Sequence, residues 1–306
     1  MVTERNLRAA AAAIAIDRIV GEPPISPHPL SVFGTWMKRC ERSLYRDSRV
    51  AGFAHLAVGI GTGIAVGTAV PSTTAASYLA IAGKSLDEAA ATVEAALLAG
   101  DLDGARRTLP ALVGRDPSGL DVNDMARAVI ESLAENTVDA VIAPALWGAV
   151  AGARGALAYR AINTLDAMVG HHNDRYEHFG WASARTDDLA NYLPARLAAG
   201  CVIAARPRMA RPILEAVRRD APRHPSPNGG VIETAFAVAL GIRLGGPSTY
   251  GTRVELRPTL GSGPHATPAD IAPARRLALE VGLIWAAVLA ATPRVMRRAT
   301  ATRNGR

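Results

Sequence analysis

Apolar residues gather in four stretches of the chain, and the longest is 51–70. This stretch carries no formal charge over about one bilayer thickness. Residues 277–293 form a second long apolar stretch, whereas 137–153 and 189–205 are shorter and each contains proline. Because a proline and a short length both weaken a spanning helix, the last two segments are compatible with tilted, re-entrant or buried helices.

A row of glycines runs through the first apolar stretch. Gly59, Gly63 and Gly67 repeat every four residues, which places them on one face of a helix. Small residues at this spacing let a second helix approach closely in a membrane. A buried core helix of a soluble protein is the alternative, but so many glycines weaken a helix in water. The pattern favours a membrane helix, and its glycine ridge is also a candidate contact between copies of the chain.

The segments between the apolar stretches are polar and differ in character. Residues 72–136 place Leu and Ala at helical spacing, which predicts amphipathic helices outside the membrane. Residues 206–276 are predicted as loops, because 206–230 and 243–272 are rich in Pro, Gly and Arg. No convincing set of strands is present. The pattern predicts an all-α, polytopic membrane protein with a single integral membrane domain over 1–306.

Composition and charge narrow the class of protein. Over 306 residues the mean hydropathy is +0.12, which fits a few membrane segments with substantial polar loops. The net charge of +7 is carried almost entirely by arginine, without the aromatic interleaving or modules typical of nucleic-acid binding. Anionic lipid or a phosphorylated substrate is the better partner. Five arginines and no acid in 294–306 favour a cytoplasmic tail by the positive-inside rule. We therefore expect a multi-pass protein of the cell (inner) membrane with its active site facing the cytoplasm.

One acidic row leads into an apolar segment. Arg127, Glu131, Glu135 and Asp139 are spaced by four and share a broad helix face. A solvated face with an Arg127–Glu131 pair is the common explanation of such a row. The row, however, continues into the apolar segment that begins at Thr137, where carboxylates are costly and usually functional. Chemistry alone leaves the two explanations about even.

A second group of polar side chains predicts a cation site. Asn163 and Asp166 share one helix face, and Asp187, Asp188 and Asn191 share another. Oxygen ligands from two such faces suit Mg²⁺ bound together with phosphates. The alternative for Asp187 and Asp188 is a charge pair that interacts with a helix dipole. Because both faces lie within about thirty residues, we favour the site.

A third group lies in the segment RRDAPRHPSPNGG at 218–230. Its prolines fix an extended loop, and its side chains form a candidate clamp for phosphate or carboxylate. The members of this group are Arg218, Arg219, His224, Ser226 and Asn228. Arginine-rich loops are also common as topology signals, so the segment alone is weak support for a site. The chain contains no complete P-loop or dinucleotide-binding glycine motif.

With these residues in place, the chain resembles the adenosylcobinamide-phosphate synthase family of cobalamin biosynthesis (cobinamide synthase, CobD/CbiB). The resemblance runs from about Ile16 to Leu260 and rests on many blocks in one order. The blocks are DRIVGEPP (17–24), HPLSVFG (28–34), GRD (114–116), IESLAENTVDAVIAP (130–144), YRAINTLDAMVG (159–170), RYEHFGWASARTDDLANYLPAR (175–196), HPSPNGG (224–230) and LGGPSTYG (244–251). The chain departs from the family pattern at Glu22, Pro117, His171, His172 and Thr252. These departures affect fine substrate contacts more than the reaction.

The resemblance implies an ATP-dependent amide ligase. It would join the free propionate of adenosylcobyric acid to aminopropanol or its O-phosphate. We expect Asp166, Asp187 and Asp188 to hold Mg²⁺ with the phosphates of ATP, with Glu131 and Glu135 in supporting catalytic roles. The candidates for binding substrate or phosphate are Asn163, Arg185, Asn191, Arg218, Arg219, His224, Ser226 and Asn228.

Two other functions remain open from the residues. The motifs NxxD at 163–166 and DDxxN at 187–191 resemble the paired motifs of Mg²⁺-dependent membrane prenyltransferases, although this chain has few long apolar helices. The second alternative function is that of a non-catalytic membrane sensor or scaffold with the same fold. If all four apolar segments crossed the membrane, the candidate residues would be divided between its two sides. We therefore expect that at least one of 137–153 and 189–205 does not span simply.

Overall fold

The computed structural model consists of two compact units, each assembled from separate stretches of sequence. The first unit comprises Met1–Ala82, Asp139–Asn191 and Ala286–Arg306, and the second comprises Gly83–Val138 and Tyr192–Trp285. The structure describes residues 2–23, 25–114, 117–250 and 253–304. Arg115 and Asp116 of the GRD motif, Pro24, Gly251 and Thr252 lie outside the described residues. The single membrane domain over 1–306 stays a prediction.

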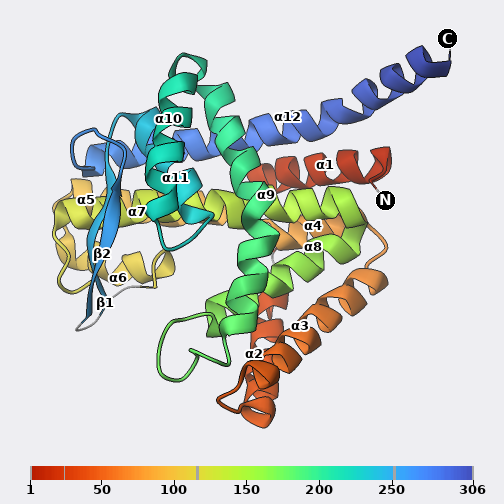
Figure 1. Cartoon of the computed structure of the whole chain (residues 1–306), viewed down its shortest axis with the longest axis horizontal. Coiled ribbons are helices and arrows are strands. Elements are labelled where there is room, and N and C mark those ends of the chain that lie inside the picture. Colours follow the sequence, from red (N-terminus) through yellow and green to blue (C-terminus); the bar gives the residue numbers. More distant parts are fainter. Residues whose placement is uncertain (1, 24, 115–116, 251–252, 305–306) are drawn as a thin grey trace. The chain divides into compact units, whose positions relative to one another are not determined.

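The first unit is helical (Figure 1). Its elements are α1 (Glu4–Val20), α2 (Pro29–Leu44), α3 (Arg49–Ala69), α4 (Thr73–Ala80), α8 (Ala143–Val169), the first part of α9 (Trp181–Ala205) and the last part of α12 (Ile271–Asn304). Ser48 caps the start of α3 by accepting a hydrogen bond from the Val50 amide. Met37, Leu56 and Leu165 form a buried core between α2, α3 and α8. This core fixes α8, which carries half of the predicted cation site.

The second unit combines helices with a small hairpin. Its elements are α5 (Gly83–Leu98), α6 (Leu102–Thr108), α7 (Val122–Thr137), the second part of α9, α10 (Ala210–Asp220), α11 (Gly229–Leu240), β1 (Leu244–Tyr250), β2 (Arg253–Leu260) and the first part of α12. Short 3₁₀ turns cover Leu109–Ala111, Pro207–Met209, Ala221–Arg223 and Pro268–Asp270. The largest buried side chains of its core include Leu109, Met125, Ile130 and Leu133. This core buries most of α7, and it leaves the acidic row of that helix facing α11 and the hairpin.

Three helical stretches of the described residues are long and apolar enough to span a membrane, which confirms the predicted class of fold. They are Arg49–Ala69, Val122–Val169 and Pro268–Pro293. The predicted segment 51–70 falls inside the first except for Val70, and the predicted segment 277–293 falls inside the third. On α3, Val50 and Phe53 are 80% and 65% exposed, which gives the helix an apolar outer face suited to lipid.

The two weaker apolar segments differ from simple spanning helices. Segment 137–153 falls inside Val122–Val169, where a π-helix over Val138–Ile142 joins α7 to α8. Gly152 breaks the regular helix, because its φ of 66° lies in the left-handed region that favours glycine. Segment 189–205 lies in α9, which contains Pro194 and is not among the three stretches found in the described residues.

The predicted loop region 206–276 is wrong in four places, because α10, α11, the hairpin β1–β2 and the start of α12 at Ile271 all lie in it. Residues 210–220 form α10, which buries Ile213, Ala216 and Asp220 at helical spacing beneath a surface rich in arginine. Residues 244–260 form the antiparallel hairpin β1–β2, not a loop. Its pairing is irregular between Leu244 and Gly246, and this irregularity conceals the period of two that marks a strand.

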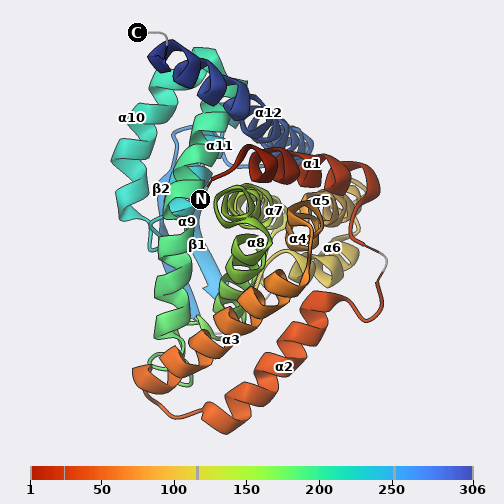
Figure 2. The ribbon, with the colours of Figure 1, turned by 90° about the vertical axis from the view of Figure 1, so that its right-hand side faces the viewer.

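The predicted glycine ridge is a helix contact within the chain. Gly59, Gly63 and Gly67 are all buried. A Cβ atom at Gly63 would lie 2.7 Å from the Leu157 carbonyl oxygen, and one at Gly67 would lie 2.7 Å from the Arg154 Cα. Figure 2 shows α3 lying across α8, so the close approach is made inside the first unit. An additional pairing between chains through this ridge stays a prediction.

Candidate functional site

The first unit brings together the two predicted faces of the cation site. Asn163 of α8 donates a hydrogen bond to Asp187 Oδ1 of α9 at 3.4 Å. Asn191 donates to Asp187 Oδ2 at 3.0 Å and accepts from the Tyr159 hydroxyl at 2.8 Å. Both oxygens of the Asp187 carboxylate are therefore held by amide groups, one from each helix. This network joins α8 and α9 at the predicted residues.

Three carboxylates are close enough in this network to influence one another. Burial, followed by the charge of Asp166, raises the pKa of Asp187 to about 7. Burial also raises the pKa of Asp188, and this rise is opposed by Arg185, whose Nη1 lies 3.3 Å from Asp188 Oδ2. A local excess of negative charge of this kind is stabilised when a cation binds.

The donor set suits a magnesium ion that arrives with phosphates. Among the described residues, no group of three or more His, Cys, Asp or Glu side chains is already arranged to hold a metal ion by itself. Mg²⁺ commonly uses only one or two protein carboxylates and takes its other ligands from water and substrate phosphates. Asp187, with its orientation fixed by two amides, and the neighbouring Asp166 fit that requirement.

Arg127, Glu131 and Glu135 of the predicted acidic row lie in the second unit, whereas Asp139 belongs to the first, and the first pair of the row is buried. Arg127 Nη1 lies 3.3 Å from Glu131 Oε1, and the two side chains are only 5% and 3% exposed. Arg127 also donates to the Gly245 carbonyl at 2.8 Å, while the Gly245 amide donates to Glu131 at 2.9 Å. The solvated-face explanation is therefore wrong for this pair. Glu131 joins α7 to the start of the hairpin.

The HPSPNGG loop faces the same end of α7. His224 and Asn228 are buried, and Ser226 is half-buried. The Ser226 amide donates to His224 Nδ1 at 3.1 Å, and the Gly229 amide donates to Ser226 Oγ at 3.0 Å. Arg196 donates to Asn228 Oδ1 at 3.2 Å. These contacts place the imidazole of His224 toward α11 and Glu135, with Ser226 as its support.

Glu233 is a buried acid that the sequence analysis missed. It is the acidic residue of α11, GGVIETAFAVAL, and its side chain is fully buried beside His224. The available signal was a carboxylate in an otherwise apolar run, which is costly without a partner or a function.

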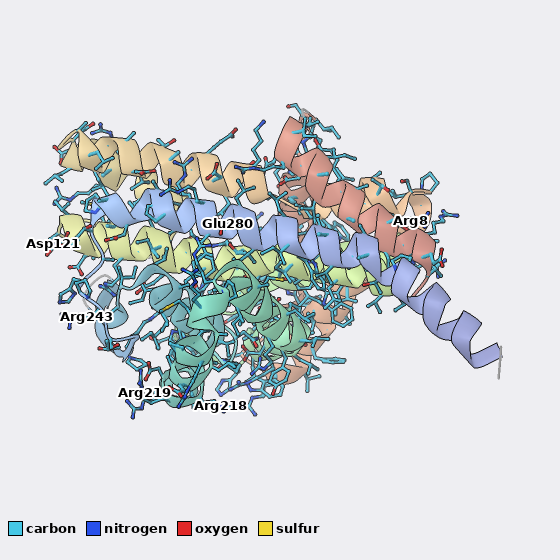
Figure 3. The ribbon with its side chains drawn as sticks, turned by 90° about the horizontal axis from the view of Figure 1, so that it is seen from above. Arg8, Asp121, Arg218, Arg219, Arg243 and Glu280 are labelled. Atoms are coloured by element: carbon cyan, nitrogen blue, oxygen red, sulfur yellow. The ribbon has the colours of Figure 1, made fainter. Side chains whose placement is uncertain are left out.

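The two arginines predicted to bind phosphate lie on the surface of α10. Figure 3 shows Arg218 and Arg219 at the outer end of this helix, and both are exposed. Arg219 forms two hydrogen bonds with the buried Asp220 carboxylate, at 2.7 and 2.8 Å. Asp220 Oδ2 also accepts from the Gly261 amide at 3.2 Å, which ties α10 to the end of β2. Arg219 therefore has a structural contact of its own.

We expect Asp220→Asn to lower the free energy of unfolding by about 2 kcal/mol, because the buried carboxylate loses the charge that strengthens its hydrogen bonds to Arg219 and Gly261. The Arg219 contact lowers the pKa of Asp220, and burial opposes part of that effect. The stabilisation is therefore present above the ordinary Asp pKa of about 3.9 and is lost as the pH falls through the lower folded value. Chemical unfolding in detergent at pH 7 and in acid will measure the loss of stability and its dependence on pH. An equal difference between the two proteins at every pH would contradict this assignment.

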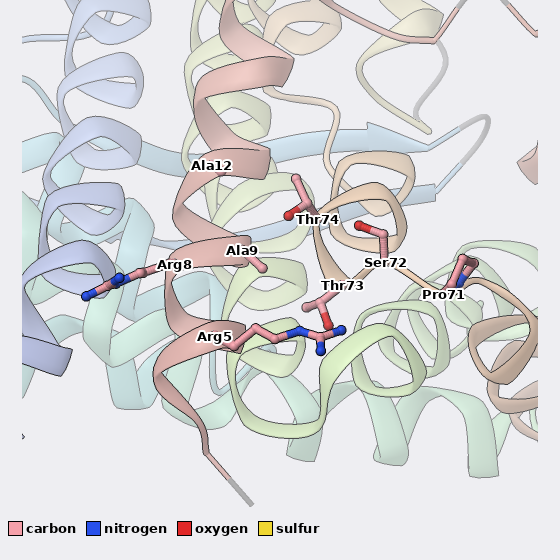
Figure 4. A pocket seen from close by; sticks show the side chains of 8 residues that line it. All are labelled: Arg5, Arg8, Ala9, Ala12, Pro71, Ser72, Thr73 and Thr74. Atoms are coloured by element: carbon pink, nitrogen blue, oxygen red, sulfur yellow. The ribbon is translucent and has the colours of Figure 1, made fainter.

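A pocket of about 340 Å³ opens elsewhere in the first unit (Figure 4). Arg5 and Arg8 of α1 line it together with Ser72, Thr73 and Thr74 at the start of α4. Figure 4 shows Arg5 extending toward Thr73 and Arg8 pointing to the opposite side of α1. None of the residues predicted to form the active site lines this pocket.

The predicted residues thus fall into two groups and a pair. The first unit holds Asn163, Asp166, Arg185, Asp187, Asp188 and Asn191. The second unit holds Glu131, Glu135, His224, Ser226 and Asn228, with Arg218 and Arg219 on α10. Each group is brought together within its own unit. The expectation that both groups serve one active site stays a prediction.

Comparison with known proteins identifies the relatives of this chain. The profile of the CobD/Cbib protein family matches residues 10–278. The chain is 44% identical over 269 residues to the cobalamin biosynthesis protein CobD of Mycobacterium tuberculosis, covering 84% of this chain and 86% of the relative. It is 44% identical over 286 residues to the protein of that name from Rhodobacter capsulatus, covering 87% and 90%. For Geobacter metallireducens the identity is 41% over 268 residues, covering 81% and 84%.

No solved structure matches the chain significantly. The family match covers most of the sequence, including both groups of candidate residues. The chain therefore belongs to the CobD/CbiB protein family of cobalamin biosynthesis.

Proposed function

We propose that the protein is a membrane-bound, ATP-dependent acid–amine ligase that joins adenosylcobyric acid to (R)-1-amino-2-propanol or its O-phosphate. The product is adenosylcobinamide or its phosphate. The observation that supports this most is the network around Asp187, where amides from α8 and α9 orient a carboxylate beside Asp166 and Asp188. In a family of cobalamin biosynthesis, a cation–phosphate site of this kind fits a reaction that consumes a nucleotide.

The first unit is proposed to bind the nucleotide phosphates. A bound Mg²⁺ would neutralise phosphate charge and polarise the transferring group. Asp166 and Asp187 are the residues that would hold it, with Asp188 beside them. Asn163 and Asn191 keep the Asp187 carboxylate from turning, which lowers the cost of ordering it when the ion arrives. Arg185, which is exposed and already paired with Asp188, is the candidate for a phosphate contact on this side.

The second unit is proposed to act on the organic substrates. A carboxylate is a poor electrophile and must be activated before an amine attacks it, and the attacking amine must lose a proton. Glu135 is the half-buried carboxylate of α7 closest to the His224 loop, while Glu131 holds the hairpin in place. Asn228 and Ser226 support the loop and offer polar groups to a substrate.

The test is a reconstituted assay with the full chain in lipid. It would contain Mg-ATP, adenosylcobyric acid and, in separate reactions, each form of the amine, and the corrinoid product would be identified by mass. We expect an amide product that requires Mg²⁺, ATP and the amine. The preferred amine form identifies the substrate. Consumption of ATP without any change in corrinoid mass would contradict the proposal.

The same assay separates the two other functions. A prenyltransferase would release pyrophosphate from a prenyl donor and would not need the corrinoid acid. A sensor or scaffold would bind the corrinoid without turnover under every condition. Either result would replace the ligase proposal.

A further inference from the structure

Glu233 has an unusual position for a carboxylate. Its side chain is fully buried in α11, and neither of its oxygens has a hydrogen-bond donor among the described residues. Burial of a carboxylate without a partner costs several kcal/mol. This cost is a large share of the free energy of unfolding of a typical domain. Such a group is retained when something else binds to it or reacts with it.

His224 is held against Glu233 by its own loop. Nε2 of His224 lies 3.4 Å from Glu233 Oε1, and the imidazole is only 2% exposed. Nδ1 lies 3.1 Å from the Ser226 amide nitrogen and 3.2 Å from the Ser226 carbonyl oxygen, so this one residue holds the ring with Nε2 facing Glu233. The contact is too long or misaligned to be a hydrogen bond, which leaves Nε2 and both Glu233 oxygens without a hydrogen-bond partner in the described part of the chain.

Glu135 completes the arrangement from α7. It is near enough to Glu233 for a hydrogen bond, but two ionised carboxylates have no proton to share, so the bond forms only when one is protonated. Gly229 lies where the three side chains meet: an added Cβ would be 2.7 Å from Glu135 Oε1, 3.1 Å from Glu233 Oε1 and 3.2 Å from His224 Cε1. Any larger residue at 229 would displace them.

The surrounding charges leave this cluster acidic. Glu131 lies on the same helix as Glu135 and is bound by Arg127 and the Gly245 amide. Arg257 on β2 is the cation whose charge favours ionisation of Glu233, and Glu131 and Glu135 both oppose it. The half-buried Glu135 gives the cluster its connection to the outside. These features suit a small cation with several N–H donors.

We propose that Glu135, Glu233 and His224 form the site that receives the ammonium group of the amine substrate and removes its proton. This inference rests on the proposed ligase function. Glu135 contacts the ammonium and accepts one proton, so an N–H bond breaks and an O–H bond forms. Glu233 and His224 are positioning residues that share this proton and keep it away from the amine. The nitrogen lone pair then forms the C–N bond, and the leaving group of the activated carboxyl departs with the second proton.

The protonation behaviour of the cluster agrees with this role. Burial raises the pKa of Glu233 well above its ordinary value, and the charges of Glu135 and Glu131 raise it further. Glu233 is therefore protonated more readily than an ordinary carboxylate, and in that form it donates a hydrogen bond to Glu135, the group that accepts the ammonium proton. Burial lowers the pKa of His224, which keeps the imidazole neutral beside the pair.

The test compares two nucleophiles in the full-length protein. Hydroxylamine is uncharged at neutral pH, so it attacks an activated carboxyl without first losing a proton to the protein. We expect Glu233→Gln to lower kcat/KM for aminopropanol about 100-fold at pH 7 while hydroxamate formation from hydroxylamine stays within about twofold of the wild type. The remaining aminopropanol activity should keep rising with pH, because the solution then supplies the neutral amine. Glu135→Gln, at a half-buried position, should show the same selective loss.

Glu215→Gln is the matched control, because this glutamate lies on the surface of α10, where it pairs with Arg211 of the same helix. It should leave both products unchanged. Equal loss of both products in Glu233→Gln and Glu135→Gln, or full aminopropanol activity in either, would overturn the inference. A wild-type protein that makes neither product would instead overturn the ligase function itself.

Discussion

Asp187→Asn will reduce amide formation on the order of a thousandfold, which corresponds to about 4 kcal/mol of transition-state stabilisation. The substitution keeps the size of the side chain but removes the negative charge that is proposed to hold Mg²⁺ and its phosphates. Both oxygens of Asp187 accept from amides, so an asparagine must also disturb one of the two hydrogen bonds to Asn163 and Asn191. The measurement is kcat in the reconstituted assay at saturating Mg-ATP, together with a titration of Mg²⁺.

Asp174→Asn provides the control for this experiment. Asp174 is an exposed aspartate in the turn before α9, so its replacement changes the net charge equally without touching the Asp187 network. It should retain full activity. Thermal unfolding of both variants will show whether the Asp187 protein is folded. Wild-type activity in a folded Asp187→Asn protein would refute the proposed cation site.

The grouping of the candidate residues in the first unit was largely predictable, because it depends on helix periodicity. Asn163 and Asp166, like Asp187 and Asn191, are spaced so that an α-helix places them on one face. The sequence could not say which residue would be central. That depended on how α8 packs on α9. The packing brings Asn163 to within 3.4 Å of Asp187, whereas Asp188 forms an ion pair with Arg185.

The second unit was less predictable, because its site depends on contacts between distant segments. The start of β1 contains Gly245 and Gly246, which both have positive φ. Two adjacent glycines give this segment the composition of a loop, although its backbone pairs with β2. Arg127 and Glu131 then bind the Gly245 backbone across more than a hundred residues of sequence. Glu233 could be recognised as a candidate only from the packing of α11 on α7, because the sequence of an apolar helix with a single acid does not show which residues surround that acid.

The second large effect is expected from substitutions of Gly63 and Gly67, where α3 packs against α8, the helix that carries Asn163 and Asp166. An alanine at either position would place its Cβ 2.7 Å from backbone atoms of α8, which cannot move as a flexible side chain does. We expect Gly63→Ala and Gly67→Ala each to lower the free energy of unfolding by about 2 kcal/mol, through overpacking that pushes α3 away from α8. Because α8 also carries Asn163 and Asp166, Mg-dependent activity should fall with stability.

Gly61→Ala is the matched control on the same helix. A Cβ atom at Gly61 would meet nothing within 4 Å, so it adds helix propensity without a clash and should be neutral or stabilising by up to about 1 kcal/mol. Unfolding in detergent micelles, followed by circular dichroism, will rank the three variants. If Gly61→Ala destabilised the protein as much as Gly67→Ala, loss of glycine itself would be the cause. Close packing of α3 on α8 would then not be what holds the proposed cation site in shape.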